Sequence, residues 1–134
     1  MNRPIIGITM GDGAGIGPEI IVKALRHASV YEMCRPIVIG DAGLLERAVR
    51  ITGGGIAVRR AASPGEGSYV HGTVDCIDLG LLPPDLPFGR LSAAAGDAAY
   101  RYIVKAVELA KSGAIRAICT APLNKEALRL AGHR

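Results

Sequence analysis

The stretch PIIGITMGDGAGIGPE, residues 4–19, decides the fold because it joins a buried strand to a helix start through a glycine-rich turn. Residues 4–9 are β-branched and apolar on both faces, which is typical of a strand covered on two sides. From Pro18 to Ala28 the apolar residues recur at helical spacing. Pro18 and Glu19 both suit the first turn of a helix. The glycines between these elements let a ligand approach the backbone closely.

The remainder of the chain continues the alternation of strands and helices. Further strands are predicted at residues 36–40, 56–60, 73–79 and 114–120, and further helices at 41–53, 92–111 and 124–131, with Asp41, Ser92 and Asn124 as caps. Residues 61–72 and the proline-rich run 83–89 are predicted to be irregular. This order favours an α/β fold in which a mainly parallel sheet carries helices on both faces.

Bulk composition excludes several classes of protein. The chain has 134 residues, of which 49% are hydrophobic, enough for one core. Its net charge is +4, but the basic residues are scattered and only 4% of residues are aromatic, so we expect no nucleic-acid partner. Three cysteines without a CxxC pair favour a reducing compartment. The apolar stretch at the N-terminus is too short for a signal peptide or a membrane span, so we expect a cytoplasmic protein without a membrane partner.

The glycine-rich turn matches neither common phosphate-binding motif. GxxxxGK[ST] is absent and GxGxxG fails in every frame, so the turn is not a standard nucleotide fingerprint. The carboxylate of Asp12 would repel a pyrophosphate and suits a ribose hydroxyl, an amide or an ammonium group. Alternatively, Asp12 stabilises a tight turn by binding backbone N–H groups. Asp41 follows the second strand, near where a ribose-binding acid is expected.

Lys125 is the best candidate for direct chemistry. It follows the last predicted strand, and the carboxyl ends of parallel strands share one edge of a sheet, so it should face the same edge as the glycine turn. A lysine there suits a phosphate or a carboxylate. Alternatively, Lys125 points to solvent from a helix start and Asn124 only caps that helix.

Three ordered segments of the chain match known sequence motifs. GDGAGIGPE at residues 11–19 is similar to the signature GDPAGIGPE, with Gly13 in place of the usual proline. LSAAAG, which begins at Leu91, resembles an L-S-x-x-x-G helix start. TAPLNKEAL at 120–128, followed by AGH at 131–133, resembles a T-A-P-x-x-K…A-G-H stretch. Together these segments resemble the 4-hydroxythreonine-4-phosphate dehydrogenase family.

The resemblance implies a fold of the isocitrate and isopropylmalate dehydrogenase type and a homodimer. It implies NAD-linked oxidation and decarboxylation of a phosphorylated hydroxy acid such as 4-phosphohydroxy-L-threonine, in pyridoxal phosphate (pyridoxine) biosynthesis. A divalent metal (Zn, Mg or Co) would be held by histidines outside this chain. Related members act on D-threonate or D-erythronate 4-phosphate, which is the first alternative.

The resemblance and the turn together define the candidate site. The cofactor-binding candidates are Gly11, Asp12, Gly13, Gly15, Gly17 and Glu19, and the substrate-binding candidates are Thr120, Asn124 and Lys125, with Lys125 also the catalytic candidate.

No metal ligand is assigned within the chain, because His27, His71 and His133 lack metal-binding spacing and are expected to be exposed or capping. The family's Gly-His-Thr-Glu segment should begin a few residues after Arg134. Residues 1–134 are therefore expected to be the N-terminal portion of a larger dehydrogenase and to lack turnover alone. The second alternative is a non-catalytic nucleotide-binding or dimerisation fragment.

Overall fold

One parallel sheet organises the computed structural model, which describes residues 3–89 and 92–133. Leu91, part of the second matched segment, lies outside these residues. The strands are β1 (Ile5–Thr9), β2 (Arg35–Gly40), β3 (Ala57–Arg60), β4 (Thr73–Asp78) and β5 (Ala117–Thr120). Every pairing is parallel and the strand order is β3-β4-β2-β1-β5. The predicted fold class is confirmed.

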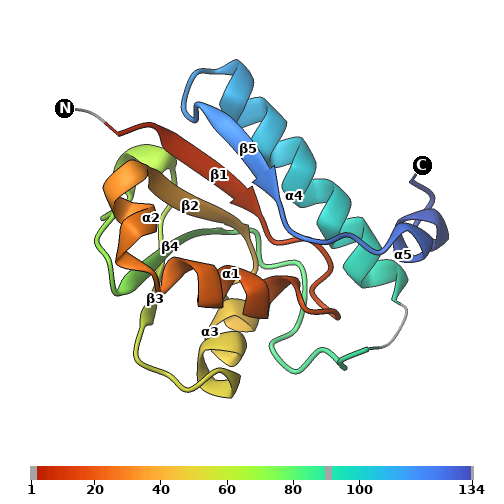
Figure 1. Cartoon of the computed structure of the whole chain (residues 1–134). Helices are drawn as coiled ribbons and strands as arrows, with labels where there is room; N and C mark the ends of the chain where they lie inside the picture. Colours follow the sequence, from red (N-terminus) through yellow and green to blue (C-terminus); the bar gives the residue numbers. More distant parts are fainter. Residues whose placement is uncertain (1–2, 90–91, 134) are drawn as a thin grey trace.

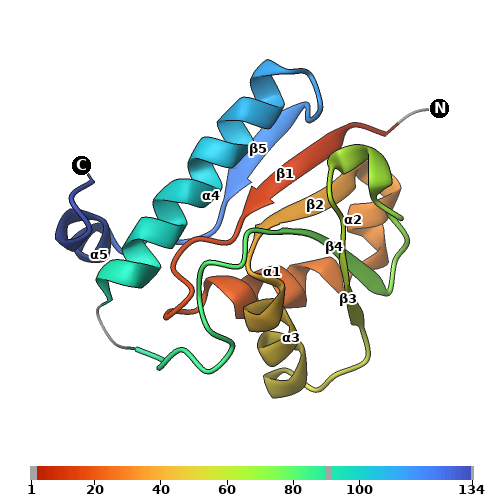
Figure 2. The same cartoon turned by 180° about the vertical axis from the view of Figure 1, so that it is seen from behind.

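Helices cover both faces of this sheet (Figures 1 and 2). They are α1 (Gly17–Leu25), α2 (Ala28–Met33), α3 (Ala42–Ile51), α4 (Ala93–Lys111) and α5 (Lys125–Leu130), with a 3₁₀ turn at Pro64–Glu66. The long helix α4 runs along one face, with α5 packed against it, while α1 and α3 lie on the opposite face. In the described part of the chain, no helix is both long and apolar enough to cross a membrane.

Two predicted boundaries were wrong. The helix predicted from Pro18 to Ala28 ends at Leu25, because His27 takes an extended conformation (φ −79°, ψ 121°) and α2 begins after it. The last strand begins at Ala117 rather than at 114. Gly113 ends α4 with a positive φ of 82°, and the amides of the next two residues bond back to Leu109. The chain needs those residues to pass from the helix to the sheet.

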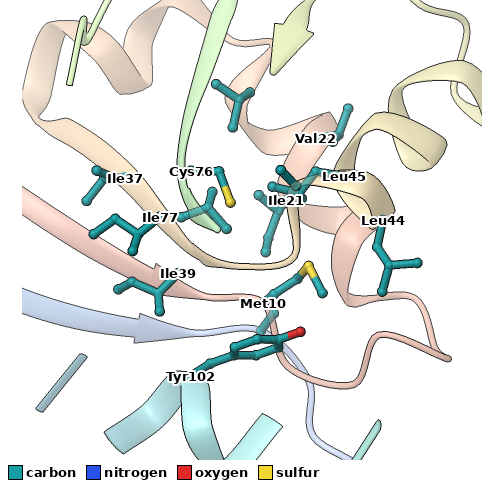
Figure 3. Packing of buried hydrophobic residues seen from close by; sticks show 14 of the residues in the cluster. Met10, Ile21, Val22, Ile37, Ile39, Leu44, Leu45, Cys76, Ile77 and Tyr102 are labelled. Carbon is teal, nitrogen blue, oxygen red and sulfur yellow. The ribbon is translucent and has the colours of Figure 1, made fainter. Parts of the chain in front are cut away.

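Mostly aliphatic side chains from β2, β4, α1, α3 and α4 fill the core, which agrees with the low aromatic content (Figure 3). Met10, directly after β1, is fully buried, and Gly40 makes room for it, because a Cβ at Gly40 would lie 2.6 Å from the Cβ of Met10. Tyr102 of α4 is equally buried on the other side of the sheet. Met10 thus fixes the point where the glycine turn leaves the sheet.

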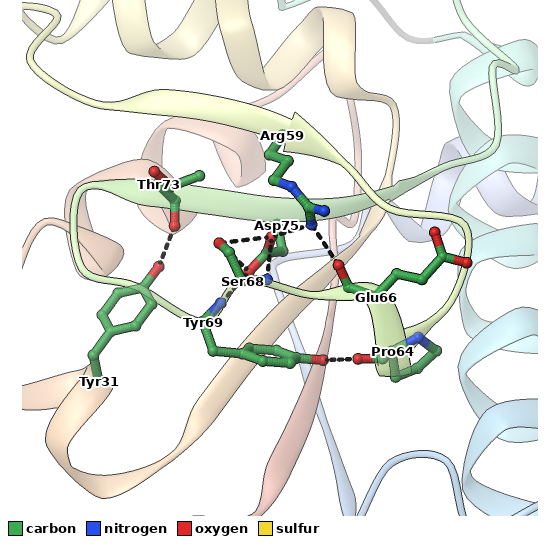
Figure 4. A network of polar contacts seen from close by, with 8 residues as sticks. All are labelled: Tyr31, Arg59, Pro64, Glu66, Ser68, Tyr69, Thr73 and Asp75. Carbon is green, nitrogen blue, oxygen red and sulfur yellow. Dashed lines mark hydrogen bonds and ion pairs between the residues drawn. The ribbon is translucent and has the colours of Figure 1, made fainter.

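A buried carboxylate organises the loop between β3 and β4 (Figure 4). Asp75 is 1% exposed and accepts hydrogen bonds from the backbone N–H groups of Ser68 (3.0 Å) and Tyr69 (2.8 Å), from the Ser68 hydroxyl, and from Arg59 (3.3 Å). Tyr69, held at a positive φ of 53°, donates its hydroxyl to the Pro64 carbonyl. The loop is therefore anchored from within.

Tyr31 provides a test of stability at alkaline pH. Its hydroxyl donates to the Thr73 carbonyl (3.1 Å), and burial, with the nearby charge of Asp75, raises its pKa to about 12 from an ordinary value of about 10. A raised folded-state pKa contributes stability that is fully present below pH ~10 and lost as pH rises towards ~12. We expect Tyr31→Phe to flatten the fall in unfolding free energy across that window, measured by urea titration at each pH. An unchanged slope would contradict this expectation.

Candidate functional site

The candidate site lies where β1 and β5 end side by side. Thr9 pairs with Thr120, so both strands finish at the same edge of the sheet. The connection continues beyond the strands, because the Ala121 amide donates to the Thr9 carbonyl (3.0 Å) and the Asp12 amide donates to the Pro122 carbonyl (3.1 Å). Two segments far apart in the sequence therefore form one surface.

A solvent-open hollow of about 390 Å³, which we call the Asp12 hollow, separates these segments. It is lined by Asp12, Gly15, Ile16, Pro122, Leu123, Asn124 and Lys125. Of the predicted site residues, the structure thus brings together Asp12, Gly15, Asn124 and Lys125. Sequence reasoning missed Ile16, Pro122 and Leu123, although each lies inside a segment that it had singled out.

The carboxylate of Asp12 serves the turn itself. Its Oδ1 accepts the Ala14 amide (3.0 Å), and its carbonyl accepts the Gly15 amide (3.0 Å). The tight-turn interpretation is therefore correct for this oxygen. The side chain is still half-buried and borders the hollow, so ligand binding by Asp12 stays a prediction.

Most glycines of the turn serve packing. A Cβ would lie 2.4 Å from the Pro122 carbonyl oxygen at Gly11, and 2.4 Å from the Met10 carbonyl oxygen at Gly17. At Gly13 it would meet the side chains of Leu44 and Leu82, at 2.8 and 2.9 Å. These contacts account for the missing side chains without a ligand. Cofactor binding by Gly11, Gly13 and Gly17 remains a prediction that no contact here tests.

Asn124 and Lys125 lie at the start of α5. Asn124 Oδ1 accepts the Ala127 amide (3.0 Å), so the capping interpretation is correct, while its side chain also borders the hollow. Lys125 is exposed and lines a second, more apolar hollow of about 640 Å³, with Leu123, Leu128, Arg129 and His133. Its ammonium group can therefore reach a ligand from either side.

Two predicted site residues lie away from the Asp12 hollow. Thr120 lines a neighbouring apolar hollow beside Ile20 and Ile21 of α1. Glu19 lies near Arg47 of α3. Burial, and then the charge of Arg50, lower the pKa of the Arg47 guanidinium, and the charges of Asp85 and Glu19 act in the opposite direction. Substrate binding by Thr120 and cofactor binding by Glu19 stay predictions that no contact here tests.

Asp41 does not take the role predicted for it. It precedes α3, but its side chain accepts no α3 amide, and Asp78 Oδ1 accepts the Ala42 amide instead (3.1 Å). The Asp41 carboxylate is buried and binds the Tyr102 hydroxyl and the amides of Leu81 (2.6 Å) and Leu82 (3.2 Å). It is therefore an internal anchor and is not exposed for a ribose.

Residues 79–89, which Asp41 anchors, contact the glycine turn, and we call this segment the strap. The Arg47 guanidinium lies 3.7 Å from the ring centre of Phe88 and donates to the Pro84 and Leu86 carbonyls. At the end of the strap, the Gly89 amide donates to the Ala14 carbonyl (2.7 Å). The prolines predicted this segment to be irregular but gave no sign that it would support the turn.

The histidines differ in their surroundings. His27 and His71 are exposed, as expected, but His133 is half-buried, stacks on Tyr100 at 3.7 Å and binds Asp97 (2.9 Å). The His133 amide donates to the Leu128 carbonyl (2.9 Å), so the capping role predicted for it is confirmed, and its ring also joins the end of α5 to α4. Within residues 3–89 and 92–133, no three His, Cys, Asp or Glu side chains form a group able to hold a metal.

The Asp12 hollow therefore presents a carboxylate and an ammonium on opposite segments. An ammonium binds phosphate or carboxylate groups, and a carboxylate accepts from hydroxyl or amino groups. A ligand that carries both an anionic group and a hydroxyl group suits this pairing.

Comparison with known proteins finds a matching family and similar relatives. The family described as "Pyridoxal phosphate biosynthetic protein PdxA" matches residues 32–134. D-threonate 4-phosphate dehydrogenase of Cupriavidus necator is 60% identical over 131 residues, which are 98% of this chain and 39% of that protein. The chain thus spans about two fifths of the length of this relative.

Two solved structures superpose closely on this chain. A 4-hydroxythreonine-4-phosphate dehydrogenase from Burkholderia phymatum superposes with a TM-score of 0.97 at 65% identity, over 99% of this chain and 40% of that one. The enzyme of the same name from Klebsiella pneumoniae gives a TM-score of 0.89 at 44% identity, over 98% of this chain and 40% of that one.

Proposed function

Because the chain belongs to the pyridoxal phosphate biosynthetic protein PdxA family, we propose that it forms the N-terminal α/β portion of a dehydrogenase for small phosphorylated hydroxy acids. The relatives that it matches are named dehydrogenases, and it spans about two fifths of each. In this proposal residues 1–134 supply part of the site and further polypeptide supplies the remainder.

The observation that carries the proposal is the Asp12 hollow. It lies at the carboxyl edge of a parallel sheet, where open α/β folds bind their ligands. Lys125 would hold a phosphate or carboxylate of the substrate, and Asp12 would accept a hydrogen bond from a hydroxyl group. These residues bind and orient the substrate.

The names of the relatives support two substrates. One relative is named for D-threonate 4-phosphate and two structures for 4-hydroxythreonine-4-phosphate. We propose oxidation with decarboxylation of 4-phosphohydroxy-L-threonine, in pyridoxal phosphate biosynthesis, with D-threonate or D-erythronate 4-phosphate as the alternative. Both classes carry the anionic and hydroxyl groups that suit the hollow.

NAD is the proposed hydride acceptor, and a cytoplasmic homodimer is the proposed assembly, both supported by the family resemblance. The glycine turn fits NAD in its place at the end of β1, although Gly11, Gly13 and Gly17 are packed against protein. The described residues do not fit the implied divalent metal, because no group of three ligating side chains occurs among them. We assign no metal ligand and no metal-dependent step to this chain.

Lys125→Ala tests the proposal in the complete gene product. We expect kcat/KM for the phosphorylated hydroxy acid, measured by NADH absorbance, to fall about 30- to 100-fold, because a charged hydrogen bond to the substrate is lost. Lys23→Ala, on the exposed side of α1, is the matched control and should retain activity. Equal activity of the two variants would remove Lys125 from the site. Failure of every such substrate with folded, metal-loaded protein would leave the non-catalytic alternative.

A further inference from the structure

A second hollow lies at the amino edge of the sheet, opposite the candidate site. It has a volume of about 200 Å³ and is lined by Arg3, Pro4, Ile5, Arg35, Gly113, Ala114, Ile115 and Arg116. Three arginine residues therefore line a space large enough for a small ion. Nothing in the proposed function uses these residues.

The register of the sheet places Arg35 and Arg116 on either side of β1. Ile5 pairs with Arg35, and Ile6 pairs with Ala117, so Arg35, Ile5 and Arg116 follow one another across neighbouring chain segments. Backbone hydrogen bonds agree with this order. The Arg35 amide donates to the Pro4 carbonyl (2.8 Å), and the Arg116 amide donates to the Ile5 carbonyl (2.7 Å). In-register residues of parallel strands point to the same face of the sheet. The positive side chains of Arg35 and Arg116 therefore lie on one face.

Among the residues that the structure describes, the three arginines of this hollow have no acidic partner. Some arginines elsewhere form ion pairs, as in Arg59–Asp75 (3.3 Å), whereas others, such as Arg26, also bind carbonyls. What sets the three apart is that they line one hollow. Between residues 3 and 133, leaving out 90–91, no carboxylate oxygen lies within 4.0 Å of the side-chain nitrogens of the three arginines in the hollow.

Backbone carbonyls orient two of the groups instead. Arg35 Nε donates to the Arg3 carbonyl (2.7 Å), and Arg3 donates to the carbonyls of Tyr31 and Cys34. Carbonyls fix the directions of the guanidinium groups without neutralising their charge. The C-terminal end of α4, beside Gly113, contributes only about half a negative charge. A strong positive potential therefore remains in the hollow.

We propose that this hollow, which we call the arginine hollow, binds a small anion with two or more negative charges, of the phosphate or pyrophosphate class. Planar guanidinium groups match the oxygens of such anions in pairs. Arg116 is exposed and available to the ligand, while Arg3 and Arg35 are held in place by their carbonyl partners. The arginine hollow is a separate site from the Asp12 hollow, because the two lie at opposite ends of the strands.

Calorimetric titration of the 134-residue chain with pyrophosphate, and separately with inorganic phosphate, tests this proposal. The ionic strength is held constant with sodium chloride, so that general screening does not change. We expect saturable binding, weakened at least about tenfold in Arg116→Gln by loss of a charged hydrogen bond. Arg50→Gln, an exposed arginine on α3, is the matched control and should bind normally.

Circular dichroism of Arg116→Gln checks that the variant is folded, and Lys125→Gln separates the two hollows. Binding that survives in Lys125→Gln and is lost in Arg116→Gln supports the proposal, whether or not the dehydrogenase assay succeeds. Absence of saturable heat, or equal binding by the Arg116 and Arg50 variants, would overturn it. Loss of binding only in Lys125→Gln would also overturn it, and would place the anion in the Asp12 hollow.

Discussion

Gly96→Ala is expected to destabilise the chain by about 2–3 kcal/mol and to loosen α5 from α4. A Cβ at Gly96 would lie 2.1 Å from the Ala127 carbonyl oxygen and 2.7 Å from the Leu128 nitrogen. Both atoms belong to backbone, which cannot rotate away as the end of a side chain can. Relief therefore requires α5 to move, and Lys125 moves with it. The glycine that ends the L-S-x-x-x-G segment is explained by this crossing.

Urea unfolding and amide exchange would measure the effect. The Gly96 variant should unfold at lower urea, and the amides of α5 should exchange faster than those of β1 and β2. Gly43→Ala is the matched control, since it also introduces alanine into a helix, but its Cβ would meet only Pro84, at 3.2 Å or more. If the two variants are equally stable, the close crossing of α4 and α5 is incorrect.

Asp75→Ala is expected to cost about 3 kcal/mol or more. The substitution leaves two backbone amides, of Ser68 and Tyr69, without an acceptor and removes the partner of Arg59. Buried donors that lose their acceptor cost about 1–3 kcal/mol each, because water cannot replace it. The loop carrying Tyr69 should open, while the Asp12 hollow, at another part of the sheet, should keep its shape.

Thermal and urea unfolding would give the change in stability, and exchange of the Ser68 and Tyr69 amides would locate it. Asp97→Ala, which removes an exposed ion pair with Arg101, serves as the comparison and should cost less than about 1 kcal/mol. Asp75→Asn retains an acceptor oxygen, so its loss of stability should lie between those of Asp75→Ala and Asp97→Ala. If Asp75→Ala lowers the unfolding free energy no more than Asp97→Ala does, Asp75 does not anchor the loop.

Much of the fold could be predicted because local patterns and global topology agree. The apolar run at 4–9 and the proline at 18 gave β1 and the start of α1 to within a residue. The separate helix α2 was missed because no glycine or proline marks the break at His27, whose extended conformation has no sequence signal. Likewise, the length of the turn before β5 depends on how far α4 lies from the sheet.

The candidate site was only partly predictable. Spacing placed the turn and Lys125 at one edge, and the structure gives them a common hollow. The glycines suggested ligand contact, yet Gly11, Gly13 and Gly17 pack against protein atoms that come from other segments. The internal roles of Asp41 and Arg47 depend on the path of the strap, and proline content cannot define that path.

The strand order also has a consequence during synthesis. Ile6 of β1 pairs with Ala117 of β5, a residue 111 positions later in the chain (117 − 6). During translation, one edge of β1 therefore has no partner strand until almost all of this segment has been synthesised. Pairings between such distant residues slow folding, since a long loop has to close first. We expect nascent chains halted before residue 117 to lack the protease resistance that β1 gains once its second neighbour has docked.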